Sequence, residues 1–394
     1  MLDLLLLLAA AIASDFPGGV TGPVDWPTSQ HVRVGVQGQS DQDDRNRQAS
    51  WYYFRIDDAT PDKEIAVTLT DLLGEYNYRA GTHAVTEKTR PVISYDNKTW
   101  THVDQVQWDE EATELTFRFA PKQSPVWIAH TPPYTNEHLA TLAQDFQDHP
   151  HFDRASAGNT VQGREIPLWT IADPAGPQDR PVVWLMFRQH AWESGTSWAA
   201  DGALRFLLGN SAEAKDLRRN VTWKLFPLAD PDGAYHGGVR FNRNGYDLNR
   251  NWDALDPATM PENYAQHQAV KLWLASGKPI NIFLTVHNTE SSEYLEGPAE
   301  HRALVNRFRD NLTRLSSFDE TRAEPQDARP STTPGMKGRM SVNQGLHADF
   351  RIPSMLMETR VQAHPGLGGR SRNIPDWLTY GEGLVRAAAA TVLE

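Results

Sequence analysis

Side chains that could carry out hydrolytic chemistry follow four apolar runs that are typical of buried strands. These runs span residues 182–187, 221–226, 280–286 and 353–357. Two histidines and two glutamates come after the first, third and fourth runs, the last two of them directly: His190, Glu193, His287 and Glu358. In open α/β sheets, ligands bind beyond the carboxyl ends of the strands. We therefore expect these four side chains to meet at one edge of one sheet.

Two histidines and one glutamate suit a zinc ion. A catalytic zinc takes three protein ligands and keeps one position for water, and two His with one Glu is a usual set. The chain has no cysteine, so any metal must be held by His and carboxylates. Such a site also accepts other divalent ions. One zinc per chain, bound by His190, Glu193 and His287, would polarise a substrate carbonyl and lower the pKa of its water.

Other charged side chains match the remaining tasks of peptide-bond hydrolysis. Glu358 could take the proton of the attacking water and pass it to the leaving amine. Arg240, in the loop after the second run, could stabilise the developing oxyanion. Asn249 and Arg250 of the same loop could hold a terminal carboxylate, because a guanidinium offers a planar fork that matches two oxygens.

Each of these features also has a plainer interpretation. His-x-x-Glu is a weak pattern, and the chain contains it twice, so Glu290 after His287 is a rival ligand. Glu358 taken alone could be a strand-end carboxylate that pairs with Arg360, and the arginines could be solvated charges near a turn. The hypothesis therefore rests on the combination of the residues.

The surrounding segments predict two domains of different class. Up to residue 132, apolar and polar residues alternate in short runs between turn residues, which indicates an antiparallel β-sandwich over 14–132. Pro132 and Pro133 end this pattern, because prolines cannot continue a central strand. Beyond them, strand-like and helix-like segments alternate, which predicts an α/β domain over 133–394 with a mixed, largely parallel doubly wound sheet. Helices are expected at 197–208, 264–274 and 302–315.

The composition excludes some partners and leaves the location open. The formal net charge of −12 argues against nucleic acid, because phosphate binding needs clustered Lys and Arg. The first residues form a short apolar run followed by Ala11-Ile12-Ala13, which is typical of a signal peptide over 1–13, although Asp3 stands where a basic residue is expected. The run is too short to span a bilayer. We expect a secreted or periplasmic protein if this segment is a signal peptide, and a cytoplasmic one otherwise.

The catalytic half resembles the zinc carboxypeptidase family that includes carboxypeptidases A and B. The matching motifs, in the order of the family, are 163–168 (GREIPL), His190-x-x-Glu193, 230–233 (DPDG), 247–252 (DLNRNW), His287 after a strand, and Glu358. The resemblance implies zinc binding by His190, Glu193 and His287, which decides against the rival glutamate. The other roles that it implies are general base for Glu358, electrophile for Arg240, carboxylate binding for Asn249 and Arg250, and orientation of His190 for Asp247.

The N-terminal half resembles the domain that precedes the catalytic unit in cytosolic-carboxypeptidase-like proteins. The segments that carry this resemblance are 51–55 (WYYFR) and 127–134 (WIAHTPPY). The catalytic half departs from the digestive members, which carry a mobile tyrosine before the catalytic glutamate: no Tyr lies between Tyr294 and Tyr380 here. The specificity pocket is expected near 335–344, where Lys337 and Arg339 would favour acidic C-terminal side chains if either faces it.

Three functions are compatible with the sequence alone. The first is a carboxypeptidase that removes single residues from the C-termini of peptides or proteins. The second keeps the fold and the zinc but acts as a deacylase or a peptidoglycan-peptide amide hydrolase. The third is a non-catalytic binding protein with a degenerate site, and the presence of every candidate residue argues against it. C-terminal amidation of the substrate distinguishes the first two, because a carboxypeptidase needs the free carboxylate.

Overall fold

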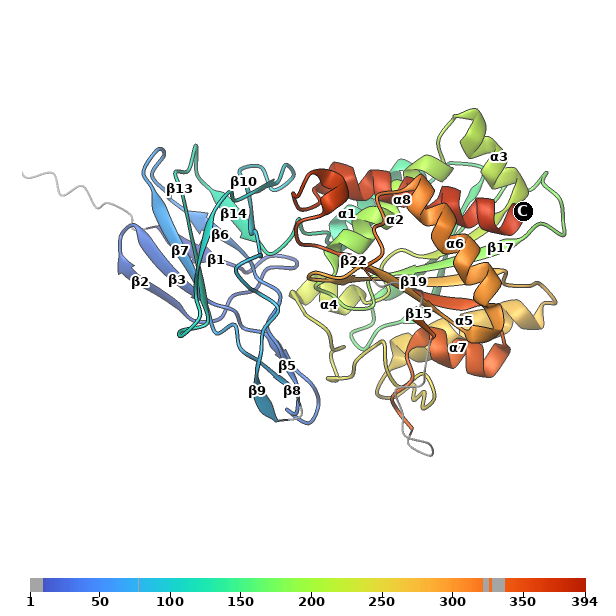
Figure 1. Ribbon diagram of the computed structural model, residues 1–394, viewed down its shortest axis with the longest axis horizontal. Coiled ribbons are helices and arrows are strands. Elements are labelled where there is room, and N and C mark those ends of the chain that lie inside the picture. Colours follow the sequence, from blue (N-terminus) through green and yellow to red (C-terminus); the bar gives the residue numbers. More distant parts are fainter. Residues whose placement is uncertain (1–9, 77, 322–325, 328–336) are drawn as a thin grey trace, which may run out of the picture. The chain divides into compact units, whose positions relative to one another are not determined.

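The chain divides into two compact units, residues 1–133 and 134–394, in the computed structural model (Figure 1). The structure describes residues 10–76, 78–321, 326–327 and 337–394. The division lies one residue after the boundary that the sequence suggests. Strands make up the regular structure of the first unit, and the second alternates strands with helices.

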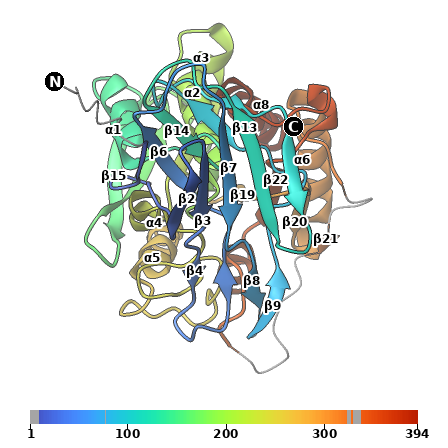
Figure 2. The same cartoon turned by 90° about the vertical axis from the view of Figure 1, so that its left-hand side faces the viewer.

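Two five-stranded sheets pack face to face in the described part of the first unit. One has the order β1 (Ala11–Ala13), β6 (Tyr53–Asp57), β14 (Val126–Ala129), β10 (Val92–Ser94) and β11 (Thr101–His102). The other has the order β12 (Val106–Asp109), β13 (Glu114–Phe119), β7 (Ile65–Thr70), β3 (His31–Gly35) and β2 (Val24–Thr28), and several of its strands are seen side by side in Figure 2. Apolar side chains of both sheets share one core, including Phe54, Ile128, Val67 and Phe117. The prediction of a β-sandwich is confirmed.

Two features of this unit differ from the prediction. Strands β3 and β7 run parallel, so the sandwich is not wholly antiparallel. In the described chain, four short strands also form a small additional sheet: β4 (Gln39–Ser40), β5 (Arg47–Gln48), β8 (Gly74–Tyr76) and β9 (Arg79–Thr82). Strands this short do not show the alternation by which a strand is recognised in a sequence.

The predicted signal peptide overlaps an ordered strand. Residues Ala11–Ala13 form β1, which pairs antiparallel with the segment 55–57 of β6 at the edge of the first sheet. The Ile12 side chain packs against the sandwich core. Cleavage near Ala13 would remove this strand, so the structure does not support the prediction of a signal peptide that ends there.

A chain that begins at Ser14 is expected to unfold more easily than one that begins at Ala10. Loss of β1 removes its backbone hydrogen bonds and uncovers the core behind Ile12, which should lower the free energy of unfolding by about 1–2 kcal/mol. Urea unfolding of the two truncated proteins, followed by tryptophan fluorescence, measures the difference. Equal midpoints would show that β1 contributes nothing and that cleavage at Ala13 is compatible with the fold.

One mixed sheet of eight described strands forms the centre of the second unit. Its order is β15 (Phe152–Asn159), β16 (Glu165–Ile171), β18 (Thr222–Phe226), β17 (Val182–Phe187), β19 (Ile282–Thr289), β22 (Ser354–Arg360), β20 (Tyr294–Gly297) and β21 (Gln326–Asp327). The four strands β18, β17, β19 and β22 run parallel. Antiparallel pairs join β15 to β16, β16 to β18, and β20 to β22. Every residue of β17 is buried, which explains its continuous apolar run.

Helices cover both faces of this sheet (Figure 1). On one face lie α2 (Ser194–Leu207), α6 (Arg302–Leu315) and α8 (Ile374–Leu393), and on the other lie α5 (Pro261–Ala275) and α7 (Val342–Phe350). The other described helical segments are α1 (Asn136–Asp145), α3 (Ala212–Asn220), α4 (Pro231–His236), η1 (Ala299–His301) and η2 (Pro365–Leu367). Helices α2 and α8 cross so closely that a Cβ atom on Gly202 would lie 2.1 Å from the carbonyl oxygen of Leu378. Only glycine fits this crossing.

Strands β19 and β22 are longer than predicted and contain the candidate residues. Strand β19 continues to Thr289 and β22 to Arg360, so His287 and Glu358 lie inside the strands rather than directly after them. The two residues are register partners in a parallel pair. Because side chains of register partners point to the same face of a sheet, His287 and Glu358 are neighbours on one face.

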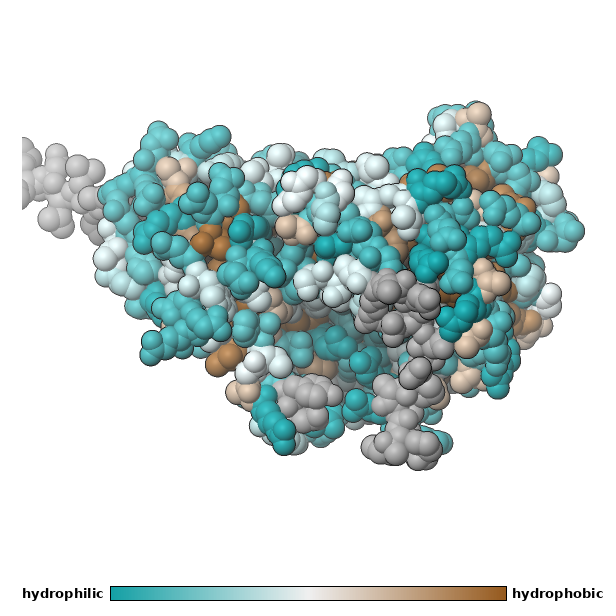
Figure 3. All heavy atoms as spheres, viewed as in Figure 1, coloured by the Kyte–Doolittle hydropathy of each residue, from teal (hydrophilic) through white to brown (hydrophobic). Residues whose placement is uncertain are grey.

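The face of the molecule shown in Figure 3 is predominantly hydrophilic. In the view of Figure 3, hydrophilic residues cover most of the face that is seen, and hydrophobic ones form small groups. Among the residues that the structure describes, no helix has both the length and the apolar content needed to cross a bilayer.

Candidate active site

A short loop after β17 places His190 and Glu193. It begins at Arg188, whose left-handed backbone conformation (φ 62°) turns the chain out of the strand. The buried Arg188 guanidinium donates to the Ala191 carbonyl at 2.6 Å and to the Tyr134 carbonyl at 3.3 Å. These bonds offset the roughly 1–3 kcal/mol that such a backbone conformation costs. The loop ends where Glu193 occupies the N-cap position of α2.

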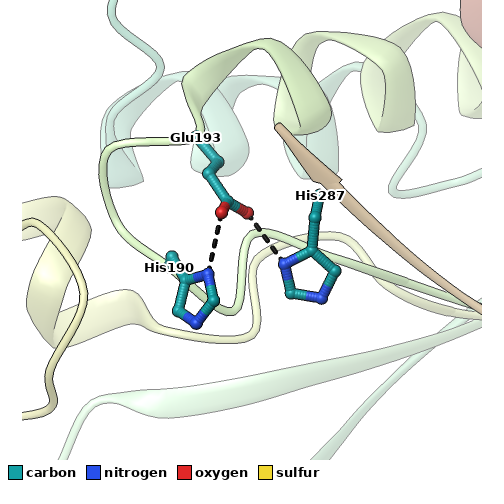
Figure 4. Close-up of side chains that lie close together, drawn as sticks. All are labelled: His190, Glu193 and His287. Carbon is teal, nitrogen blue, oxygen red and sulfur yellow. Dashed lines mark hydrogen bonds and ion pairs between the residues drawn. The ribbon is translucent and has the colours of Figure 1, made fainter. Parts of the chain in front are cut away.

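His190, Glu193 and His287 converge inside the second unit (Figure 4). One ligand atom from each residue can be chosen so that all three lie within 4.8 Å of one another. One carboxylate oxygen of Glu193 lies 2.8 Å from His190 Nδ1, and the other lies 3.0 Å from His287 Nδ1. None of the three residues is more than 2% exposed. Strand β19 supplies His287, and the loop after β17 supplies the other two.

These contacts fit a bound cation. Burial alone would raise the pKa of Glu193, but the two imidazoles outweigh it and lower this pKa to about 2, so the carboxylate is ionised. Burial lowers the pKa of His287, which favours the neutral imidazole with one ring proton. When that proton is on Nε2, lone pairs of His287 Nδ1 and Glu193 face each other at 3.0 Å. A divalent metal between them removes this repulsion and matches the donor set.

Asp247 contacts both His190 and Arg240. Its Oδ1 lies 3.0 Å from His190 Nε2, and its Oδ2 accepts a 2.7 Å hydrogen bond from Arg240 Nε. Burial alone would raise the pKa of Asp247, but Arg240 and His190 hold it well below its ordinary value. The ionised carboxylate keeps a proton on His190 Nε2, so that Nδ1 is left to face Glu193.

Asn249 and Arg250 follow Asp247 in the same loop. Asn249 is buried, and its Oδ1 accepts a 3.0 Å hydrogen bond from the backbone N–H of Val342 at the start of α7. Its amide NH2 group is a donor, and a donor suits a carboxylate. Arg250 is partly buried and donates to the Asn249 carbonyl at 2.7 Å.

Glu358 lies beside His287 on the neighbouring strand and is partly buried. Its charge reaches Arg240: burial would lower the pKa of this arginine, but Asp247, Glu193 and Glu358 together raise it. The arginine is therefore cationic. The loop after β17, the loop after β18 and the ends of β19 and β22 thus bring the predicted residues to one place.

The rival ligand Glu290 lies apart from this group. It follows the end of β19, and its Oε2 accepts a 3.5 Å hydrogen bond from Gln362. Among the described residues, the set that could hold a metal consists of His190, Glu193 and His287.

The structure describes part of the predicted specificity segment. Residues 335 and 336 lie outside the described residues, Lys337 is exposed and Arg339 is partly buried. The Asp253 carboxylate accepts hydrogen bonds from the backbone N–H groups of Gly338 and Met340, both at 3.1 Å. This contact ties the segment to the loop of Asn249 and Arg250. The preference for acidic side chains stays a prediction.

Sequence reasoning missed two buried polar residues that contact the site, Gln189 and Thr285. Gln189 precedes His190 directly, and Thr285 lies two positions before His287 on the same face of β19. The Thr285 hydroxyl lies 3.0 Å from His287 Nε2. A signal was present, because a polar residue inside an apolar strand, two positions from a ligand, must point to the ligand's face.

Fold and site together define a class of protein. The second unit is an α/β domain with a mixed sheet, and it contains a buried His-Glu-His group with a second glutamate beside it. This combination is typical of metallohydrolases. Comparison with known families gives the same class: residues 137–317 match the zinc carboxypeptidase model, and residues 12–130 match the cytosolic carboxypeptidase N-terminal domain. The chain therefore contains a zinc carboxypeptidase domain over residues 137–317, and the N-terminal domain of the cytosolic carboxypeptidases over residues 12–130.

Individual relatives agree with this family. Cytosolic carboxypeptidase 1 of Danio rerio is 30% identical over 186 residues, which are 44% of this chain and 16% of that protein. Cytosolic carboxypeptidase 3 of Bos taurus is 24% identical over 267 residues, which are 63% of this chain and 26% of that protein. The chain thus spans only a small part of the length of these curated relatives.

Solved structures cover nearly the whole chain. A metallo-carboxypeptidase from Burkholderia cenocepacia superposes with a TM-score of 0.83 at 21% identity, over 97% of this chain and 99% of the other. The metallo-carboxypeptidase from Pseudomonas aeruginosa, solved with (2-guanidinoethylmercapto)succinic acid, gives a TM-score of 0.80 at 23% identity, over 96% and 98%. At these identities the likeness shows the shared fold of both units.

Proposed function

We propose that the protein is a zinc-dependent metallocarboxypeptidase that hydrolyses the C-terminal peptide bond of peptides or proteins. The observation that carries this proposal is the buried group of His190, Glu193 and His287, with Glu358 beside it on the next strand. The match of residues 137–317 to the zinc carboxypeptidase model supports the same reaction class.

Each polar side chain of the site has a task in this reaction. When bound by the three ligands, one zinc ion supplies a Lewis acid that polarises the scissile carbonyl and activates water. Glu358 accepts a proton from the attacking water and delivers it to the nitrogen of the leaving amino acid. Arg240, kept cationic by Asp247, stabilises the negative charge that develops on the carbonyl oxygen. Asp247 also keeps His190 in its ligating orientation.

Asn249 and Arg250 restrict the reaction to the end of a chain. The NH2 group of Asn249 and the guanidinium of Arg250 are donors without acceptor character, so they suit the two oxygens of a free α-carboxylate. A peptide bond in the middle of a chain offers only a neutral carbonyl there. The enzyme therefore needs a free C-terminus close to the scissile bond.

Peptide pairs that differ only in C-terminal amidation test this proposal. The zinc-loaded protein is expected to shorten the free acid residue by residue and to leave the amide intact, as measured by mass spectrometry. Arg250→Ala should lower kcat/KM on the free acid by roughly 10- to 100-fold, because charged hydrogen bonds are lost. Arg250→Lys should recover only part of the loss, because an ammonium lacks the planar fork.

Two results would oppose the proposal. Equal turnover of acid and amide would mean that the carboxylate is not recognised. If free-acid peptides stay intact although each chain binds one zinc ion, the proposed peptidase activity is ruled out. Acylated amino acids and peptidoglycan peptides would then be the substrates to try, in keeping with the alternative of a deacylase or amide hydrolase.

We also propose that the protein acts in the cytoplasm. Two observations support this: the relatives named above are cytosolic carboxypeptidases, and β1 uses the residues that a signal peptidase would remove. Determination of the N-terminal residue of the protein from its native cells tests the location. A mature chain that begins near Ser14 would contradict it.

A further inference from the structure

A buried chain of hydrogen bonds runs from the second histidine ligand to the backbone of the carboxylate-binding loop. His287 Nε2 lies 3.0 Å from Thr285 Oγ1. The Thr285 hydroxyl donates to Gln189 Oε1 at 3.1 Å, and Gln189 Nε2 donates to the Leu248 carbonyl at 3.0 Å. His287, Thr285 and Gln189 are each 0% exposed, so no water competes for these bonds.

The direction of every hydrogen bond in this chain follows from the Leu248 carbonyl, at its far end. The Leu248 carbonyl can only accept, so the NH2 group of Gln189 must face it and Oε1 must face Thr285. An amide oxygen can also only accept, so the Thr285 hydroxyl donates its single proton there. What remains at Thr285 is a lone pair, and it is satisfied only if His287 Nε2 carries a proton. The opposite assignment would leave the buried oxygen of Gln189 without a donor, which costs free energy.

We propose that Gln189 and Thr285 are positioning residues that hold the proton of His287 on Nε2, so that Nδ1 offers its lone pair to the metal. This inference rests on the proposed function, because it assigns the two residues to the zinc site. Metal-bound histidines depend on such partners for their tautomer and ring orientation.

Neighbouring residues of one loop thus orient both histidine ligands, one through a charged group and the other through neutral groups. His190 contacts the Asp247 carboxylate directly. His287 is connected to the carbonyl of the next residue, Leu248, through two neutral side chains. A neutral connection fixes the tautomer without a further negative charge next to Glu193 and Glu358. The loop of residues 247–248 therefore controls both ligands at once.

Zinc affinity measured by competition with a chromogenic chelator tests the inference. Thr285→Val keeps the side-chain shape but removes the acceptor, and it should weaken zinc binding by about 10- to 100-fold. Thr285→Ser restores the hydroxyl and should bind within about threefold of the wild type, as expected when the hydroxyl and not the methyl group matters. Gln189→Leu keeps Thr285 but removes the acceptor of its hydroxyl proton. The hydroxyl can then turn and donate to His287, so this variant should also weaken zinc binding. Gln189→Leu therefore provides an independent test if Thr285→Val does not fold.

A spectroscopic readout separates this role from a general loss of stability. In zinc-loaded protein with 15N-labelled histidine, the Nε2-bound proton of His287 should give a signal shifted by its hydrogen bond to Thr285. That signal should persist in Thr285→Ser and move upfield in Thr285→Val. The matched control is Thr391→Val, which removes a buried hydroxyl from α8, where it bonds to Ala387 and Asn311. It should change neither zinc affinity nor the His287 signal.

The outcomes distinguish the inference from the proposed function. If the wild type binds zinc and both Thr285→Val and Gln189→Leu bind it equally tightly with the His287 signal unchanged, the inference is wrong and the metal site stands. If the wild type binds no zinc, the proposed function fails and the inference fails with it. Weakened binding in both variants, rescued by Thr285→Ser, would support the inference.

Discussion

Replacement of Glu358 by glutamine is expected to lower kcat by about 10²- to 10⁴-fold, the usual contribution of a general base. Glutamine keeps the size and the position on β22 but cannot accept the proton of the attacking water. Zinc content and KM should change little, because His190, Glu193 and His287 are untouched. Stopped assays on a free-acid peptide and metal analysis of the same sample measure both quantities.

The control for this prediction is a glutamate elsewhere on the second unit. Glu300→Gln changes a side chain that is 62% exposed on η1, and kcat should not change. A Glu358→Gln enzyme that keeps kcat within tenfold of the wild type would show that another group takes the proton.

Replacement of Glu293 by alanine is expected to lower the free energy of unfolding of the second unit by about 3–5 kcal/mol, as for other broken buried ion pairs. Glu293 is 0% exposed. Its carboxylate lies 2.8 Å from Arg372 Nη2, 2.8 Å from His364 Nε2 and 3.6 Å from Arg360 Nε. Without it, two buried guanidinium groups lose a carboxylate that no solvent can replace. Urea unfolding monitored by circular dichroism measures the loss.

An exposed ion pair provides the comparison for this stability effect. Glu213 contacts Arg386 at 2.9 Å, and about half of the Glu213 side chain (51%) is exposed. Water solvates both groups when the pair is broken, so Glu213→Ala should cost only about 0–1 kcal/mol. Similar losses in the two variants would mean that burial of Glu293 adds nothing to the strength of its contacts.

Apolar patterns predict the fold best where burial is complete. Strand β17 and helix α6 have the bounds that their sequences suggest, because one is apolar throughout and the other has a regular apolar stripe. Helix α2 begins at Ser194, three residues before the predicted start. Its first turn is polar, since it follows the ligand Glu193, and an apolar period cannot reveal a turn of this kind. The same limit hides the ends of β19 and β22, which are polar where they carry the site.

The candidate site could be predicted from its histidines, its charged residues and Asn249, but not from Gln189 and Thr285. Two histidines and two glutamates after apolar strands are rare enough in combination to be noticed. Thr285 is marked only by being polar inside an apolar strand. Gln189 and the Leu248 carbonyl carry no signal, because their importance depends on the direction of hydrogen bonds between segments far apart in the chain. The left-handed conformation of Arg188 could not be foreseen either, since only the folded interior makes it favourable.

Because His287 and Glu358 are register partners, their spacing does not depend on the loops that would select the substrate. Their spacing is set by backbone hydrogen bonds between β19 and β22, at roughly the 4.8 Å that divides neighbouring strands. Asn249, Arg250 and the segment around Arg339 lie on loops instead. Under the proposed function, insertions and substitutions in those loops would alter which C-terminus is accepted without moving Glu358 relative to His287. Substrate range can therefore diverge among descendants of this chain while the hydrolytic machinery stays the same, and an engineer can exchange the loops with the sheet left untouched.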